Sequence, residues 1–72
     1  MDTLKFQTNI NSEEKLAKAA LVVDKLEGVA EWTVDVDSLY HLLTVKGVGI
    51  DALKVISVLE AAGFTVLQLF EE

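Results

Sequence analysis

The stretch from Asn9 to Lys15 holds the densest group of side chains that could bind a metal ion. Its sequence is Asn9-Ile10-Asn11-Ser12-Glu13-Glu14-Lys15. Amide, hydroxyl and carboxylate oxygens are ligands for hard cations. However, their spacing matches no calcium-loop motif, and the adjacent Glu13 and Glu14 point to different sides of a helix start. The residues favour capping of a following helix, and a weak oxygen site in residues 9–15 stays open as the alternative.

Three other features have residue types that are used in catalysis. His41 is the only histidine in the chain, and acid–base or nucleophilic chemistry would need a partner group that no motif supplies. Asp35 and Asp37 share one side of a predicted strand. We expect them to form a solvated sheet edge that discourages aggregation, rather than a catalytic pair. The lone Gly-x-Gly at 47–49 is explained by a turn. We expect His41 to be exposed at a strand end, and we expect no enzymatic activity.

The composition excludes several classes of function. The chain has no cysteine and one methionine, Met1, so neither a disulfide nor a thiolate zinc site can form. Twelve acidic residues, six lysines and no arginine give a net charge of −6, which opposes binding to nucleic-acid phosphates. No segment approaches the ~18 consecutive apolar residues of a membrane span, and the first residues do not resemble a secretory signal. We therefore expect a cytoplasmic domain with no nucleic-acid or membrane partner.

Apolar periodicity predicts six elements in a single domain spanning residues 1–72. Strands are expected where apolar and polar residues alternate, and helices where apolar residues recur at three and four positions. Ser12 and Asp51 have the residue types of helix N-caps, and Gly28 and Gly63 those of helix stops. In chain order we expect a strand over 4–8, a helix over 13–27, strands over 31–36 and 40–46, a helix over 52–62 and a strand over 64–70.

This order of elements is that of the split βαβ, or ferredoxin-like, arrangement in the α+β class. It consists of a four-stranded antiparallel sheet with both helices on one face. Right-handed crossover connections place the first and third strands at the centre of the sheet and the second and fourth at its edges.

Several runs of the sequence resemble heavy-metal-associated domains, the copper-chaperone-like modules. The resemblance covers nearly the whole chain and rests on these residues: 5–10 (KFQTNI), 23–29 (VDKLEGV), 32–35 (WTVD), 43–47 (LTVKG) and 59–64 (LEAAGF). In that family a Met-x-Cys-x-x-Cys loop binds copper(I) or another soft metal through two thiolates. The resemblance places Ile10 at the methionine position, Ser12 and Lys15 at the two cysteine positions, and Phe64 at the aromatic or lysine position beside the loop.

Both soft-metal ligands of the family are therefore replaced in this chain. A serine hydroxyl is a poor ligand for a soft metal, and a lysine ammonium repels a cation. Although the resemblance implies copper or another soft metal as the cofactor, we expect that none is bound at this loop.

The sheet face that the helices leave uncovered is a candidate interaction surface. If Leu43 and Val45 face the helices, then Tyr40 and Leu42 face the other way. Leu67 and Leu69 join them in one register of the last strand. The sequence leaves this register open, because Val66 and Phe70 compete for the core. Such residues form an apolar patch that fits a protein partner or a homodimer, and ordinary surface apolarity is the alternative.

Two functional classes follow from these observations. The first is an interaction or regulatory module that has lost the metal loop of its family. The second is a metal-handling domain with an atypical weak site in residues 9–15. A small-molecule-binding module of the ACT type shares the topology, but it rests on fold analogy alone.

Overall fold

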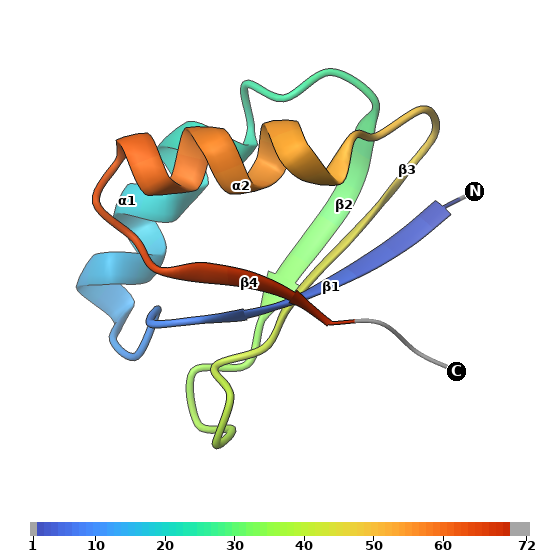
Figure 1. Ribbon diagram of the computed structural model, residues 1–72. Coiled ribbons are helices and arrows are strands. Elements are labelled where there is room, and N and C mark those ends of the chain that lie inside the picture. Colours follow the sequence, from blue (N-terminus) through green and yellow to red (C-terminus); the bar gives the residue numbers. More distant parts are fainter. Residues whose placement is uncertain (1, 70–72) are drawn as a thin grey trace.

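The computed structural model describes residues 2–69 and confirms the predicted order of elements. The strands and helices are β1 (Asp2–Thr8), α1 (Glu13–Val23), β2 (Val29–Val34), β3 (Leu43–Gly47), α2 (Ala52–Ala61) and β4 (Val66–Leu69). The sheet order is β2-β3-β1-β4, and all neighbouring strands are antiparallel. Both helices lie on one face of this sheet (Figure 1). The fold is thus the ferredoxin-like α+β arrangement, with β1 and β3 central.

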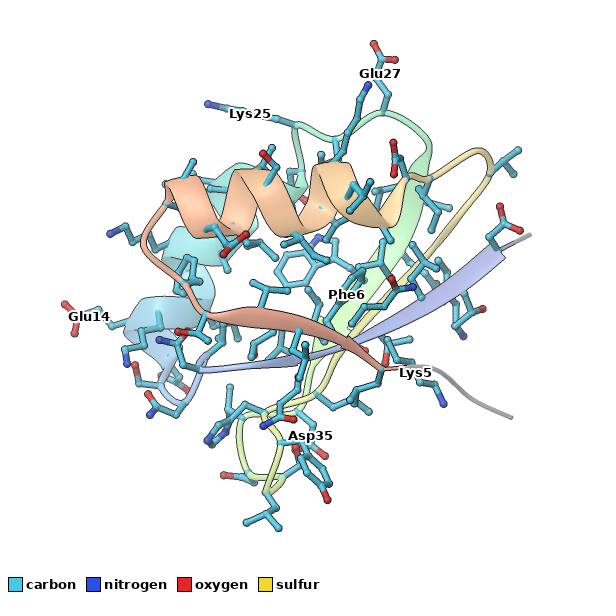
Figure 2. All side chains as sticks on the ribbon, viewed as in Figure 1. Lys5, Phe6, Glu14, Lys25, Glu27 and Asp35 are labelled. Carbon is cyan, nitrogen blue, oxygen red and sulfur yellow. The ribbon has the colours of Figure 1, made fainter. Side chains whose placement is uncertain are left out.

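Alternating residues of the two central strands build the floor of the core. Phe6 of β1 and its cross-strand partner Leu43 are fully buried, as is Val45, because every second side chain of a strand points to the same face. Figure 2 shows Phe6 between the sheet and the helices, whereas Lys5 points away from them. The rest of the core comes from the helices and two connections: Ile10, Ala19, Val23, Val55, Leu59 and Phe64.

Both helices begin at the predicted caps, because a side-chain oxygen at each N-cap accepts a backbone N–H that lacks a partner within the helix. The Ser12 hydroxyl accepts from the backbone N–H of Lys15 at 3.3 Å, and the Asp51 carboxylate accepts from that of Leu53 at 3.0 Å. The end of α1 was predicted wrongly, since the helix stops at Val23 instead of residue 27.

The turn between α1 and β2 accounts for this earlier helix end. The backbone N–H of Leu26 donates to the carbonyl of Val23, which tightens the chain into a turn. Gly28 then has φ 85°, a left-handed conformation that glycine adopts without a Cβ clash. The carbonyl of Gly28 accepts from the N–H of Val48. This contact ties the turn to the end of β3.

The connection between β2 and β3 is longer than predicted, since it covers residues 35–42 instead of 37–39. The strand β2 covers Val29–Val34 instead of 31–36, and β3 begins at Leu43 instead of residue 40. Within the connection, the Asp35 carboxylate accepts from the N–H of Asp37 at 3.2 Å. The expectation that these two carboxylates line one side of a strand is therefore wrong, because they form a side-chain-stabilised turn.

The register of β4 is now settled for the described residues. Val66 pairs with the buried Thr8 and packs against the core, so Leu67 and Leu69 turn to the open face. The strand is shorter than predicted, because Phe64 is buried in the core and Thr65 donates its N–H to the Asn9 side chain. The predicted last residue of the strand, Phe70, lies outside the described residues. Neither α1 nor α2 is long and apolar enough to cross a bilayer.

Candidate functional site

The loop that joins β1 to α1 lies between two other connections. On one side, the backbone N–H of Thr8 donates to the carbonyl of Tyr40 in the β2–β3 connection. On the other, the Asn9 side-chain oxygen accepts from the N–H of Thr65 at 3.0 Å, from the α2–β4 connection. Three connections therefore meet at this end of the sheet, and the loop is held by both neighbours.

Ile10, at the second position of the loop, is a core residue. Its side chain has 0% exposure and belongs to the main hydrophobic cluster. Its backbone N–H donates to the hydroxyl of Thr8 at 3.2 Å. An apolar side chain buried in this way fixes the path of the loop by packing and offers no donor atom to an ion.

The next two positions of interest, Ser12 and Lys15, are joined by the N-cap hydrogen bond of α1. The hydroxyl oxygen of Ser12 is thus engaged by the backbone, while the side chain of Lys15 is exposed to solvent. Glu13 and Glu14 are also exposed, and Figure 2 shows Glu14 projecting outward from α1. Within residues 2–69, no three histidine, cysteine, aspartate or glutamate side chains come close enough to hold a metal ion together.

Thr8 is the residue near this loop that sequence reasoning missed. It is the only buried polar side chain among the described residues, at 7% exposure. Its hydroxyl donates to the carbonyl of His41 at 2.6 Å and accepts from the N–H of Ile10. A usable signal was present, since Thr8 continues the inward alternation of Leu4 and Phe6 along β1.

Replacement of Thr8 by valine is expected to destabilise the domain. Valine has nearly the same shape, but it leaves the buried N–H of Ile10 without its partner and removes the donor to His41. An unsatisfied buried group costs about 1–3 kcal/mol of unfolding free energy. Urea denaturation followed by circular dichroism measures this loss, and Thr8→Ser, which keeps the hydroxyl, serves as the control. A Thr8→Val variant as stable as the wild type would contradict the role of this hydroxyl.

His41 holds the β2–β3 connection and is not an exposed strand-end residue as expected. It is half-buried and lies two residues before β3. Its backbone has φ 47°, the left-handed region that histidine enters more easily than most residues. Its ring Nδ1 lies 3.1 Å from the carbonyl oxygen of Val36. Because a carbonyl only accepts, Nδ1 carries the proton in this bond, and the ring closes the turn.

Comparison with known proteins gives a clear answer from structure and none from sequence. No protein-family model matches the chain, and no curated protein matches it. Among solved structures, the N-terminal domain of ZntA in its apo form is 19% identical with a TM-score of 0.81, over 94% of this chain and 92% of that one. The N-terminal domain of PacS from Synechocystis PCC6803 is 15% identical with a TM-score of 0.82, over 97% and 100%.

A third similar structure names the fold directly. It is the apo form of the heavy-metal-associated domain of the copper chaperone for superoxide dismutase, 16% identical with a TM-score of 0.78. The alignment covers 94% of this chain and 66% of that one. This chain has the heavy-metal-associated fold. The predicted resemblance is confirmed at the level of the fold, together with the absence of cysteine from the loop.

In this heavy-metal-associated fold the β1–α1 loop is present, and its side chains contribute to core packing and helix capping. The resemblance assigns the ligand positions to Ser12 and Lys15, and here one caps a helix and the other extends into solvent. Ile10, at the methionine position, is part of the core. The three positions provide no soft donor atom, and one of them carries an ammonium group, which repels a cation.

The predicted interaction residues of this domain are only partly brought together. Leu67 is 60% exposed and Leu69 is half-buried on the open side of β4. Leu42 is half-buried just before β3, and Tyr40 is 53% exposed in the turn. The two β4 leucines face Gln7 and Lys5 of β1, and these polar side chains separate them from β3. The open face thus presents two apolar areas, not one continuous patch.

Proposed function

We propose that this domain is a non-catalytic, cytoplasmic protein-interaction module that retains the heavy-metal-associated scaffold without soft-metal binding at its loop. The observation that carries the proposal is that none of the three family positions of the loop offers a ligand for a soft metal. Ile10 is buried, the Ser12 hydroxyl accepts a backbone hydrogen bond, and Lys15 is an exposed cationic residue at the position of a family cysteine. Copper(I) prefers thiolate and thioether ligands, so this loop offers it nothing that water does not.

The alternative is a metal-handling domain with a weak oxygen site in residues 9–15. Such a site would have to compete with the hydrogen bonds that Asn9 and Ser12 already accept. Glu13 and Glu14 would then supply the charge, but they start a helix and project in different directions. These contacts make the alternative the less supported of the two.

The open face of the sheet supplies the interaction surface in this proposal. Leu67 exposes 60% of its surface on a strand at the edge of the sheet. Leu69 is half-buried on the same strand, and Leu42 and Tyr40 form a second apolar area at the end of the β2–β3 connection. When a partner removes exposed apolar side chains of this kind from water, the complex is stabilised by about 25 cal/mol per Å² of apolar surface buried.

The test compares one leucine on the open face with one on the helices. Leu67 is 60% exposed on β4 and Leu21 is 68% exposed on α1, so replacement by glutamate makes the same chemical change at each. We expect the wild-type domain to self-associate in sedimentation velocity or to retain a defined partner from extracts of its source cells. We expect Leu67→Glu to weaken that association by about tenfold or more, as loss of a central apolar contact does.

The control variant decides whether the surface is specific. Leu21→Glu should leave the association within about twofold of the wild type, because surface changes outside the interface have small effects. If the wild type stays monomeric at high concentration and retains no partner, the interaction function loses its support. Equal loss in both variants would place the binding surface elsewhere.

A further inference from the structure

The connection between β2 and β3 ends in two exposed apolar side chains. Leu39 is 86% exposed, more than any other large apolar side chain among residues 2–69, and the neighbouring Tyr40 is 53% exposed. Behind them, the Ser38 hydroxyl donates to the carbonyl of Asp35 at 3.0 Å and accepts from the N–H of Leu42 at 3.1 Å. We call Leu39 and Tyr40 the tip. Because hydrogen bonds already fix the loop that carries the tip, binding through it orders little additional chain.

The charges beside the tip are negative. Asp35 and Asp37 are exposed in the same connection, and residues 35–42 contain neither lysine nor arginine. Asp37 takes part in the turn through its backbone N–H, and its side chain is exposed. His41 is half-buried, and its ring nitrogen bonds the carbonyl of Val36 within the connection. The tip is therefore an apolar projection with acidic flanks.

A cavity lies at the opposite end of the sheet from the tip. It is formed by the α1–β2 turn, the β3–α2 connection and the first turn of α2, and Figure 1 shows these segments at one end of the sheet and the β2–β3 connection at the other. Its volume is about 380 Å³, within the range of about 300–1,000 Å³ that is usual for ligand pockets. The apolar part of its lining consists of buried and half-buried side chains: Leu26, Val29, Ile50 and Val55. We call it the end cavity.

Charged side chains of both signs border the end cavity. Lys25 and Lys54 are exposed there, as are Glu27 and Asp51. The Asp51 carboxylate accepts the N–H of Leu53 and so serves as a helix cap. Lys25 and Glu27 both project outward from the α1–β2 turn (Figure 2). Lys54 has no ion-pair partner within the described part of the chain, so its ammonium group is the charge that can meet an incoming carboxylate.

We propose that the tip of one copy inserts into the end cavity of a second copy, so that the domain assembles head to tail. Leu39 and Tyr40 meet the apolar lining, and Asp37 lies near Lys54 of the second copy. This inference rests on the proposed interaction function and names one partner, a second copy of this chain. Because the tip and the end cavity are at opposite ends of the sheet, the contact is heterologous and lets further copies add.

Two opposing electrostatic effects act on this contact. The net charge of −6 on each copy opposes the approach of two copies at low ionic strength. The contact itself pairs an apolar projection with acidic flanks and an apolar cavity with an available lysine, which is the complementarity that selects a second copy. At about 0.15 M salt the Debye length is about 8 Å, so the distant charges are screened more than the contacting ones. We therefore expect association to be stronger at about 0.15 M salt than at about 0.01 M.

The experiment mixes two variants that each lack one side of the contact. Leu39→Glu removes the tip and keeps the end cavity, whereas Lys54→Glu alters the end cavity and keeps the tip. Both are made in the Leu67→Glu background, so that the open face contributes as little as possible. Fluorescence polarisation of labelled Leu39→Glu, titrated with Lys54→Glu, measures binding of the mixed pair. It should be at least about tenfold tighter than Leu39→Glu with itself and about threefold tighter than Lys54→Glu with itself.

Exchange of charge identifies the contacting pair. Asp37→Lys should restore binding of the tip to the Lys54→Glu cavity by about threefold or more over the unchanged tip. Lys18→Glu makes the same change of charge on α1, outside the end cavity, and should alter binding of the tip by less than about twofold. All the replaced side chains are exposed, so the variants should fold, and circular dichroism of each one checks this first.

Several results would overturn the proposal. These are no binding of the mixed pair, equal binding of the mixed pair and of Leu39→Glu with itself, or equal effects of Lys54→Glu and Lys18→Glu. If the mixed pair fails to bind while Leu67→Glu still abolishes capture of a partner, only this inference fails and the proposed interaction function stands. If the mixed pair binds while Leu67→Glu leaves the capture of a partner intact, the head-to-tail contact stands and the open face loses its support.

Discussion

The double substitution of Ser12→Cys with Lys15→Cys is expected to create a tight copper(I) site in this domain. The heavy-metal-associated scaffold places these two positions at the end of the β1–α1 loop and in the first turn of α1. Thiolates are stabilised at the N-terminus of a helix and are the ligands that copper(I) prefers. The change also removes the ammonium group of Lys15. We expect the affinity for copper(I) to rise by at least about a thousandfold over the wild type.

A competition titration against a chromophoric copper(I) chelator, under anaerobic and reducing conditions, measures this gain. The matched control is the double substitution Ser12→Ala with Lys15→Ala, which removes the same side chains without adding thiols. Both variants lose the serine cap, which costs about 1 kcal/mol of stability, so their folding is compared first. If the cysteine variant binds copper(I) no better than the alanine variant, the loop does not have the geometry that the family uses.

The substitution Ile10→Ala is expected to destabilise the domain severely, although Ile10 lies in a loop. The side chain is fully buried and contributes to the main core cluster. Truncation of a buried isoleucine costs about 2–5 kcal/mol, from lost burial and from the cavity left behind. A small domain has a total stability of about 5–15 kcal/mol. The variant should therefore lose a large share of the free energy of unfolding, and urea denaturation measures this loss.

Two companion variants make the Ile10 result specific. Ile10→Met nearly conserves the volume and should cost less than about 1.5 kcal/mol, and it restores the residue that the family has at this position. Asn11→Ala changes an exposed neighbour in the same loop and should stay within about 0.5 kcal/mol. An Ile10→Ala variant as stable as Asn11→Ala would show that the loop is not anchored by the core.

The fold was predictable because its periodic patterns are local. The inward residues of β1, the caps at Ser12 and Asp51, and the order of strands all follow from the spacing of apolar and capping residues. The β2–β3 connection was not predictable in detail. Its shape depends on Thr8, which binds the carbonyl of His41 from 33 positions away along the chain, and such a contact leaves no local pattern.

The candidate site was likewise predictable only in part from the sequence. Capping by Ser12 was predictable from residue type, whereas the burial of Ile10 was not, because a lone isoleucine among polar residues carries no periodicity. The face of Leu67 was ambiguous since Val66, Leu67 and Leu69 satisfy either alternation. The register with β1 resolves it, because Val66 stands opposite the buried Thr8.

The measurement that tests the central claim most directly is a copper(I) titration of the unmodified domain against the same chelator. Ile10 packs in the core, Ser12 caps α1 and Lys15 is exposed to solvent. The wild type should therefore not retain copper(I) against the chelator. It should also behave like the Ser12→Ala variant. Retention of copper(I) in the micromolar range or tighter, lost in Ser12→Ala, would contradict the claim that this loop is now part of the scaffold.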